Sequence, residues 1–491
     1  MIAIAWASLI LWPVVVIILF RRLSLPLALS ISVVGGYLLL PVNFGLDLPV
    51  LPVLNKHSIT ALVAAAMTFA MAKGAGTLPG ILPRDRVTQV LLAILIFGTF
   101  GTILTNSDGL SYGPMYLPGL RPYDAFSILM STIIVVLPLF LARKLLATPE
   151  AQRSLLVVLA VAAGIYTIPT LWEVRMSPQL HNQLYGFATF QFGQSVRGGG
   201  FRPVVFTGHG LSLAIFLTFA ILASAALSRI DGAQQRGRWI AAVVWLMLVL
   251  VLAKSLGALM IAILFLPVVF FLRARTQALI AACIAGIVLT FPLLRSADLI
   301  PIDRVVSIAN SIDPLRAASL EFRLDNEEEL LEKARERMVF GWGSWSRNRV
   351  FDANGRDISV TDGSWIIELG TGGLLRYVAV FGLLSWPIIA LFVKGREAVD
   401  PVSAALALIL CGKLIDLIPN SDLILGVNWI IAGALLGRIE MNARAGQGAS
   451  VAPTQTPTGP ARPATRYSRT PPTPGRVAQV NPYARKPQTP N

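Results

Sequence analysis

Cysteine and charged residues are both scarce in this chain of 491 residues. Only two cysteines occur, and Cys283 and Cys411 both fall inside long apolar runs, so the sequence offers no disulfide framework and no cysteine–histidine metal motif. Charged residues make up 14% of the chain, against about 25% in a soluble globular protein. Because the few charges gather between the apolar runs, the composition excludes an ordinary soluble domain and predicts a membrane protein.

The apolar runs predict the fold class, which we expect to be an all-α, polytopic integral membrane protein. The runs are continuously apolar instead of alternating, which favours helices over barrel strands. A helix of about 20 residues crosses the hydrocarbon core, and several runs are shorter, so we expect 12–13 spans. The pair of runs around Lys254 is either one broken helix or two helices. The candidate spans lie at 2–20, 24–42, 57–72, 87–106, 123–142, 154–172, 203–228, 239–253, 256–272, 276–294, 364–393, 402–419 and 423–437.

Lysine and arginine in the short loops predict the orientation, since such residues concentrate on the cytoplasmic side. With thirteen spans, six loops that contain basic residues all fall on one side. The N-terminus and the two larger loops, 173–202 and 295–362, then face outward. We expect no cleavable signal peptide, because Arg21 and Arg22 follow the first apolar run instead of preceding it.

A change of composition divides the chain into a membrane domain, 1–442, and a C-terminal tail, 443–491. The tail contains ten prolines and seven basic residues but no Asp or Glu, so it accounts for nearly half of the net charge of +15. Such a segment buries too little apolar surface to fold alone. We expect a disordered cytoplasmic tail that rests on anionic lipid, with docking to a cytoplasmic partner as the alternative. Nucleic-acid binding is not expected, because no folded basic module is evident.

The loop 295–362 holds half of the chain's 26 acidic residues and is expected to be partly helical. A helix is predicted over 314–338, with Asp313 as its N-cap and Pro314 at its first position. Gly341 follows as a stop signal. A folded external loop of this size is a common place for the chemistry of a membrane protein.

Five short segments combine basic residues, glycine and aromatic residues in a definite order along the chain. They are RGGGFRPVVFTGHG at 197–210, KSLGAL beginning at Lys254, EFRLDNEEEL around Arg323, FGWG at 340–343 and LGTGG at 369–373. Together with the span pattern, these segments carry a resemblance to a known family.

The chain resembles the O-antigen ligase and O-antigen polymerase superfamily over about 190–385, and over its whole length in the arrangement of spans. In two places it departs from the family pattern. The family's His-Asn pair is replaced by Thr361-Asp362-Gly363, and its Ser-Arg-Gly-Ala segment is replaced by KSLGAL, in which the basic residue precedes the serine. Because of the first departure, the sequence does not identify the general base, and it does not decide between a ligase and a polymerase.

The resemblance implies transfer of a glycan from an undecaprenyl-diphosphate carrier to an acceptor at the outer face of the bacterial inner membrane. Ligases of the family deliver the glycan to the lipid A–core of lipopolysaccharide, and polymerases extend a repeat unit. It further implies an inverting membrane glycosyltransferase that uses no metal and no cofactor. The partners would be the undecaprenyl-diphosphate-linked glycan, a glycan or lipid acceptor and the membrane lipids.

Basic residues in these segments are the candidates for binding the diphosphate, because Arg and Lys stabilise the charge that develops on the leaving group. These diphosphate-binding candidates are Arg197, Arg202, Lys254 and Arg323. The acceptor hydroxyl needs a general base. The catalytic candidates are Arg323 together with Asp362, which stands where the family has His, and His209; Glu321 and Asp325 follow as further bases.

Each candidate also has a purely structural interpretation. Arg197 and Arg202 could extend to lipid headgroups beside a span, and Arg323 could belong to a solvated ion-pair face. Lys254 could sit in a tight external turn, Asp362 could cap the next helix, and His209 could be a packing residue. Glu368 and Asp416 lie within expected spans, where Arg376 or Lys413 as an ion-pair partner would make them structural.

Two other classes of function remain open at this stage. A transporter of polysaccharide or lipid-linked oligosaccharide would be expected to show internal repeats, and none is evident. A non-catalytic membrane protein of envelope assembly is suggested only by the Pro-rich tail.

Overall fold

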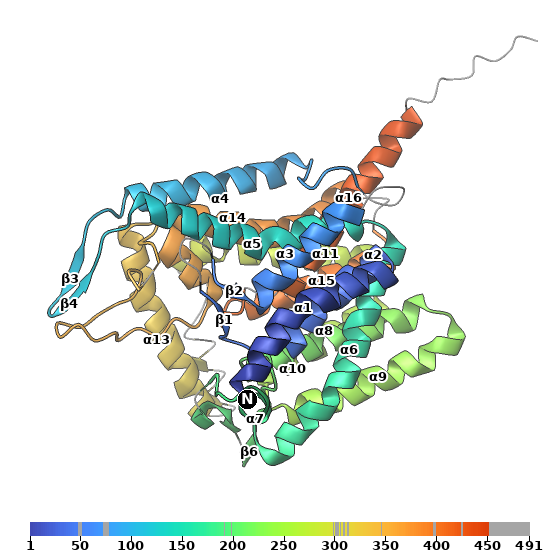
Figure 1. Ribbon diagram of the computed structural model, residues 1–491, viewed down its shortest axis with the longest axis horizontal. Helices are drawn as coiled ribbons and strands as arrows, with labels where there is room; N and C mark the ends of the chain where they lie inside the picture. The colour runs from blue at the N-terminus through green and yellow to red at the C-terminus, as the bar shows by residue number, and fades with distance from the viewer. Residues whose placement is uncertain are drawn as a thin grey trace, which may run out of the picture. The chain divides into compact units, whose positions relative to one another are not determined.

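α-Helices make up nearly all of the regular structure of the chain, which confirms the all-α fold class (Figure 1). The computed structural model describes residues 1–450 except 48–51, 72–77, 191, 198, 298, 300–303, 305, 308–309, 312–313, 345, 396–398 and 424–425. The expected N-cap Asp313 and the part of the tail from 451 onward lie outside the described residues.

Every expected span overlaps a helix of the structure. In the part of the chain that the structure describes, eight helices are long and apolar enough to cross a membrane by length and composition: α1 (Ile2–Arg22), α4 (Arg86–Leu104), α5 (Pro122–Leu145), α6 (Pro149–Met176), α8 (Gly210–Ile230), α9 (Ala233–Leu252), α11 (Ala274–Ser296) and α14 (Ser364–Lys394). The remaining expected spans match α2 (Leu25–Leu39), α3 (Lys56–Met71), α10 (Leu256–Phe271), α15 (Pro401–Asp416) and α16 (Gly426–Ser450). The protein is therefore a polytopic α-helical membrane protein.

Local sequence signals set several helix starts. Thr148 caps α6 by accepting a hydrogen bond from the Ala151 N–H, and Pro149 occupies its first turn. Asp400 and Pro401 begin α15 in the same way. At its far end α16 continues to Ser450, beyond the expected boundary at 442, because the first proline of the tail comes only at 453.

Helix α8 lies at the centre of the membrane domain. Of its most apolar window, 94% is buried within the protein, against 22% for α1 and for α9, whose exposed apolar side chains suit a lipid environment. Small residues such as Ala and Ser are frequent along α8 and let α6, α9, α10 and α15 approach it closely. The residues at the start of α8 are therefore anchored to the most deeply packed element of the fold.

The expected basic loops meet at one end of the helices, here called the basic end. Arg143 in the last turn of α5 forms a buried ion pair with Glu440 of α16, and the Glu440 carboxylate also accepts the Arg84 N–H at 2.7 Å. Arg153 binds Asp231 at 2.7 Å and so joins the start of α6 to the end of α8. These contacts link loops that the positive-inside rule had assigned to one side.

The opposite end, here called the site end, carries the short elements. They are β1 (Gly45–Leu46) paired with β2 (Leu54–Asn55), β3 (Leu110–Tyr112) paired with β4 (Met115–Leu117), α7 (Leu180–Tyr185), the 3₁₀ turn η1 (Phe192–Ser195), β5 (Val196–Arg197) paired with β6 (Gly200–Phe201), and α13 (Pro314–Glu336). The expected loop helix 314–338 is thus confirmed as α13.

Helix α14 is broken at Gly373, whose φ of 67° and ψ of −169° are not helical. The segment after α13 fills the break. The N–H groups of Trp342 and Gly343 donate to the carbonyls of Gly370 and Thr371 at 2.8 Å, and the Leu374 N–H donates to the Met338 carbonyl at 2.7 Å. FGWG and LGTGG, which the sequence alone could only place in order, therefore form one backbone-paired unit that fixes the end of α13 against α14.

Candidate functional site

Arg197, Arg202 and Lys254 lie together at the site end. The Lys254 Nζ donates to the Arg197 carbonyl at 2.8 Å, and the Arg202 Nη2 donates to the Lys254 carbonyl at 3.4 Å. Lys254 connects α9 to α10 with a left-handed φ of 53°, so the two runs around it are separate helices. The tight-turn interpretation of Lys254 is correct for its backbone, and its side chain also holds the β5–β6 hairpin.

The segment 203–209 is a loop, and the expected span from 203 to 228 was wrong at its start because the helix begins only at Gly210. Pro203 supplies no N–H, and Val205 has a left-handed φ of 51°. Glu173 of α6 replaces the missing helical hydrogen bonds, since its Oε2 accepts the N–H groups of Val204 at 2.8 Å and Val205 at 2.7 Å. A buried carboxylate thus fixes the loop that leads into α8.

His209 is the N-cap of α8, because its Nδ1 accepts the Leu211 N–H at 3.2 Å. It therefore lies at the helix start, not inside an apolar run as the sequence had suggested. Burial lowers the pKa of the His209 imidazole, and the positive charges of Arg202, Arg323 and Arg197 lower this pKa further. His209 is thus a neutral imidazole on which the charges of three of the four basic candidates act.

Arg323 of α13 and Asp362, just before α14, form an ion pair with 3.3 Å between Nε and Oδ2. Their side chains are 38% and 39% exposed, so the pair opens to solvent. The interpretation of Asp362 as a helix cap was wrong, because the cap residue is Gly363 and no side chain caps this helix. The Ser364 N–H instead donates to carbonyls of the chain after α15, those of Leu417 and Asn420, at 3.0 Å.

Glu327 was missed as a candidate by the sequence analysis. It follows Arg323 by one helical turn, and its Oε1 is buried without a hydrogen-bond partner among the described residues. Burial raises the pKa of Glu327 to about 7, and the negative charge of Asp362 contributes to this rise. The candidate bases Glu321 and Asp325 are exposed instead. The sequence does not distinguish Glu327 from the neighbouring acidic residues of α13. Only the packing of α13 against α14 shows which of these carboxyl groups is buried.

Glu368 and Asp416 have the ion-pair partners that would make them structural. Glu368 pairs with Arg376 at 2.6 Å within α14, and Asp416 pairs with Lys413 at 2.8 Å within α15. Lys413 also lies 3.6 Å from Asp422, a carboxylate whose charge raises the pKa of His209. Asp422 therefore balances part of the positive charge at the site, and it too was missed.

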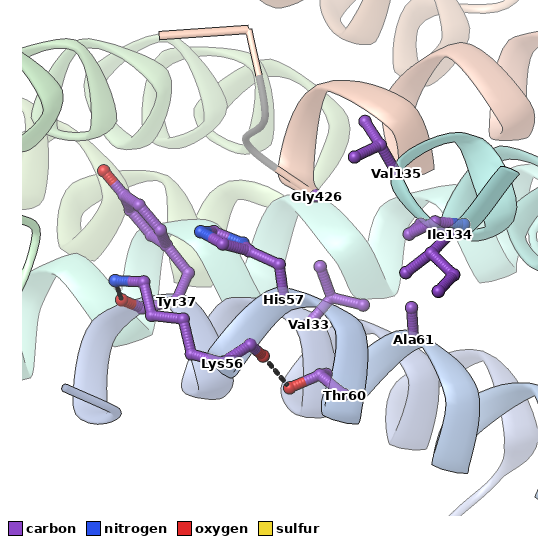
Figure 2. A pocket seen from close by; sticks show the side chains of 10 residues that line it. Val33, Tyr37, Lys56, His57, Thr60, Ala61, Ile134, Val135 and Gly426 are labelled. Atoms are coloured by element: carbon purple, nitrogen blue, oxygen red, sulfur yellow. Dashed lines mark hydrogen bonds between the residues drawn. The ribbon is translucent and has the colours of Figure 1, made fainter. Parts of the chain in front are cut away.

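A narrow cavity lies between α2, α3, α5 and the start of α16 (Figure 2). His57 lines it from α3, together with Tyr37 and Lys56. The Lys56 Nζ donates to the carbonyls of Tyr37 at 3.1 Å and Phe206 at 3.2 Å. Through these bonds Lys56 connects α2 to the loop 203–209.

The site thus joins segments that are distant in sequence: the β5–β6 hairpin, the α9–α10 turn, the start of α8, and the α13–α14 pair. The positive charges of three arginines act on a neutral imidazole, and Asp362 pairs with one of these arginines, so the site can bind an anion and accept a proton. Within the described residues, no group of three or more His, Cys, Asp or Glu side chains could hold a metal ion. No protein-family model and no curated protein matches the chain.

Proposed function

We propose that the protein transfers a glycan from an undecaprenyl-diphosphate-linked donor to an acceptor at the outer face of the bacterial inner membrane. In this proposal the site end faces outward and the basic end faces the cytoplasm, in agreement with the positive-inside rule. The observation that carries the proposal is the hydrogen-bonded cluster of Arg197, Arg202 and Lys254, together with the positive charges of Arg202, Arg323 and Arg197 that act on the His209 imidazole. A cluster of like charges at the end of a mostly apolar helix bundle suits a lipid-linked anion.

The diphosphate would bind between the β5–β6 hairpin and α13. Arg202 and Arg323 present guanidinium groups, which bind phosphate oxygens in pairs and stay charged when partly desolvated. The neutral state of His209 keeps an additional positive charge out of this cluster until a ligand enters. The polyprenyl chain of the donor would remain in the lipid beside the helices.

The ion pair between Arg323 and Asp362 supports an ordered reaction. A bound diphosphate competes for Arg323, and the Asp362 carboxylate is then released from its partner. The acceptor hydroxyl attacks the anomeric carbon, its proton passes to Asp362, and the bond from that carbon to the diphosphate oxygen breaks with the electron pair leaving on the diphosphate. Attack from the face opposite the leaving group inverts the anomeric centre.

The surface glycan profile of a deletion strain tests this proposal. Loss of core-attached glycan with accumulation of the lipid-linked chain would identify a ligase, and a ladder reduced to the core plus one repeat would identify a polymerase. Complementation with wild type should restore the profile, whereas Arg202→Gln and Arg323→Gln should not. Arg335→Gln is a matched control, because Arg335 lies on the same helix in an exposed pair with Glu328. An unchanged profile in the deletion strain would overturn the proposal.

A further inference from the structure

A second cavity, of about 300 Å³, lies at the site end between the end of α6, helix α7 and the chain that leads to η1. Its size is at the lower limit of the roughly 300–1,000 Å³ typical of small-molecule pockets. Its walls combine rings and polar groups. They include Pro178, Gln179, Asn182, Thr189, Phe190 and Phe192.

The polar groups of this cavity are neutral. Among the described residues, no Asp, Glu, Lys or Arg side chain lines it. The ring nitrogens of His181, which also lines it, are both engaged, with Nε2 accepting the Val42 N–H at 3.2 Å and Nδ1 lying 3.0 Å from the Phe187 carbonyl. Burial lowers the pKa of His181, which keeps this ring uncharged as well. A phosphate or a charged headgroup would find no counter-charge here.

Two features of the cavity require a ligand with both an apolar face and hydroxyl groups. The Thr189 Oγ1 is buried and has no hydrogen-bond partner among the described residues, and a buried hydroxyl without a partner is unfavourable. Phe192, which lines the cavity, is 53% exposed, so much of its ring surface is open to a ligand. A sugar ring offers C–H groups to an aromatic ring and hydroxyl groups to Thr, Asn and Gln side chains.

Phe192 links the cavity to the segment that carries Arg197 and Arg202. Phe192 begins η1, which runs directly into Val196 and Arg197, and the Phe192 ring lies 5.9 Å from that of Phe201 on β6. The Arg202 N–H donates to the Ser195 carbonyl at 2.7 Å. A glycan whose diphosphate is held by the arginines would therefore have its sugar residues within reach of this cavity.

We infer that the cavity formed by α7, residues 188–190 and Phe192 is a binding subsite for an uncharged sugar ring of the glycan. The inference rests on the proposed function for the source of the glycan, while the binding itself depends only on the cavity. Phe192 would stack on the ring, and Thr189 and Asn182 would bond its hydroxyl groups. The subsite would select sugars without carboxylate or phosphate substituents at this position.

Binding of a lipid-free oligosaccharide to the full-length protein in nanodiscs tests the subsite. The probe is the repeat unit released by mild acid from the source bacterium's own surface polysaccharide, measured by saturation-transfer NMR and calorimetry. Thr189→Val, which keeps the shape of the side chain, and Phe192→Ala should each weaken binding by roughly tenfold. Phe271→Ala is the control, because Phe271 is 80% exposed at the far end of α10.

The outcomes separate this inference from the proposed function. Arg323→Gln should abolish transfer yet leave oligosaccharide binding intact, which would support the subsite. If wild type transfers glycan but neither Thr189→Val nor Phe192→Ala changes binding, the subsite is overturned while the proposed function stands. If the two variants instead weaken attachment to vesicles of anionic phospholipid and leave oligosaccharide binding unchanged, the cavity faces lipid headgroups and the inference is likewise wrong.

Discussion

Arg323 and Asp362 are separated by 39 positions in the chain, yet they form a half-exposed ion pair with 3.3 Å between Nε and Oδ2. The pairing of FGWG with the break in α14 determines this geometry, because it fixes the end of α13 beside the start of α14. An exposed pair of this kind contributes about 1 kcal/mol or less to stability. The importance of the pair for function therefore lies in its position beside the basic residues of the site, and not in its contribution to stability.

Exchanging the two charges distinguishes a structural pair from a functional one. The double variant Arg323→Asp with Asp362→Arg should keep the free energy of unfolding within about 1 kcal/mol of wild type but should lose transfer, because the arginine no longer faces the diphosphate. Thermal unfolding and complementation of the glycan profile measure the two effects. Recovered transfer in the double variant would show that only the attraction between the two residues matters.

His209 combines a capping role with its place among the arginines, and two substitutions separate these roles. His209→Asn keeps a good N-cap, whereas His209→Ala removes it at a cost of about 1 kcal/mol. We expect both variants to lose transfer and only the alanine variant to lose stability. Full activity of His209→Asn would assign the residue to capping alone.

The raised pKa of Glu327 leads us to expect that the stability of the fold depends on pH. Its pKa is raised to about 7 in the folded protein, so the neutral carboxyl stabilises the fold at low pH and this contribution is lost as the pH rises through 7. The loss amounts to about 3 kcal/mol at most. The melting temperature of wild type should fall from pH 5 to pH 8 more than that of Glu327→Gln.

The exposed Glu329 is the matched control for this titration. The Glu329→Gln variant should follow the wild-type dependence on pH. Parallel curves for wild type and Glu327→Gln would mean that Glu327 does not ionise in this range.

Gly373 is predicted to be irreplaceable by alanine. Its left-handed φ disfavours a side chain, and an added Cβ would lie 2.3 Å from the Val339 carbonyl oxygen. We expect Gly373→Ala to destabilise the protein by about 1–3 kcal/mol and to displace α13 from α14. Faster amide hydrogen exchange in 314–343 would report the displacement.

Gly164 provides the comparison, because an added Cβ there meets nothing within 4 Å. Gly164→Ala should leave both stability and exchange near wild type, or raise stability slightly through helix propensity. Equal effects of the two substitutions would show that the break in α14 at Gly373 is not required for the packing of α13 against α14.

The sequence by itself determined the all-α membrane fold, the positions of the spans and the loop helix. Apolar runs and capping residues are local signals, and they act on the residues that carry them. The same pattern failed at 203–209, since apolar residues there form a loop whose backbone is held by Glu173 from another helix.

Tertiary structure alone decided which candidates share a site. Arg197, Arg202, Lys254, Arg323, His209 and Asp362 were each recognisable as residue types in suggestive segments, but their proximity depends on helices packing across large sequence separations. Glu327 and Asp422 had no distinguishing pattern, because burial beside another element, and not sequence context, sets the environment of a carboxyl group. Composition thus specified the membrane and the helices, and long-range packing specified the chemistry at their ends.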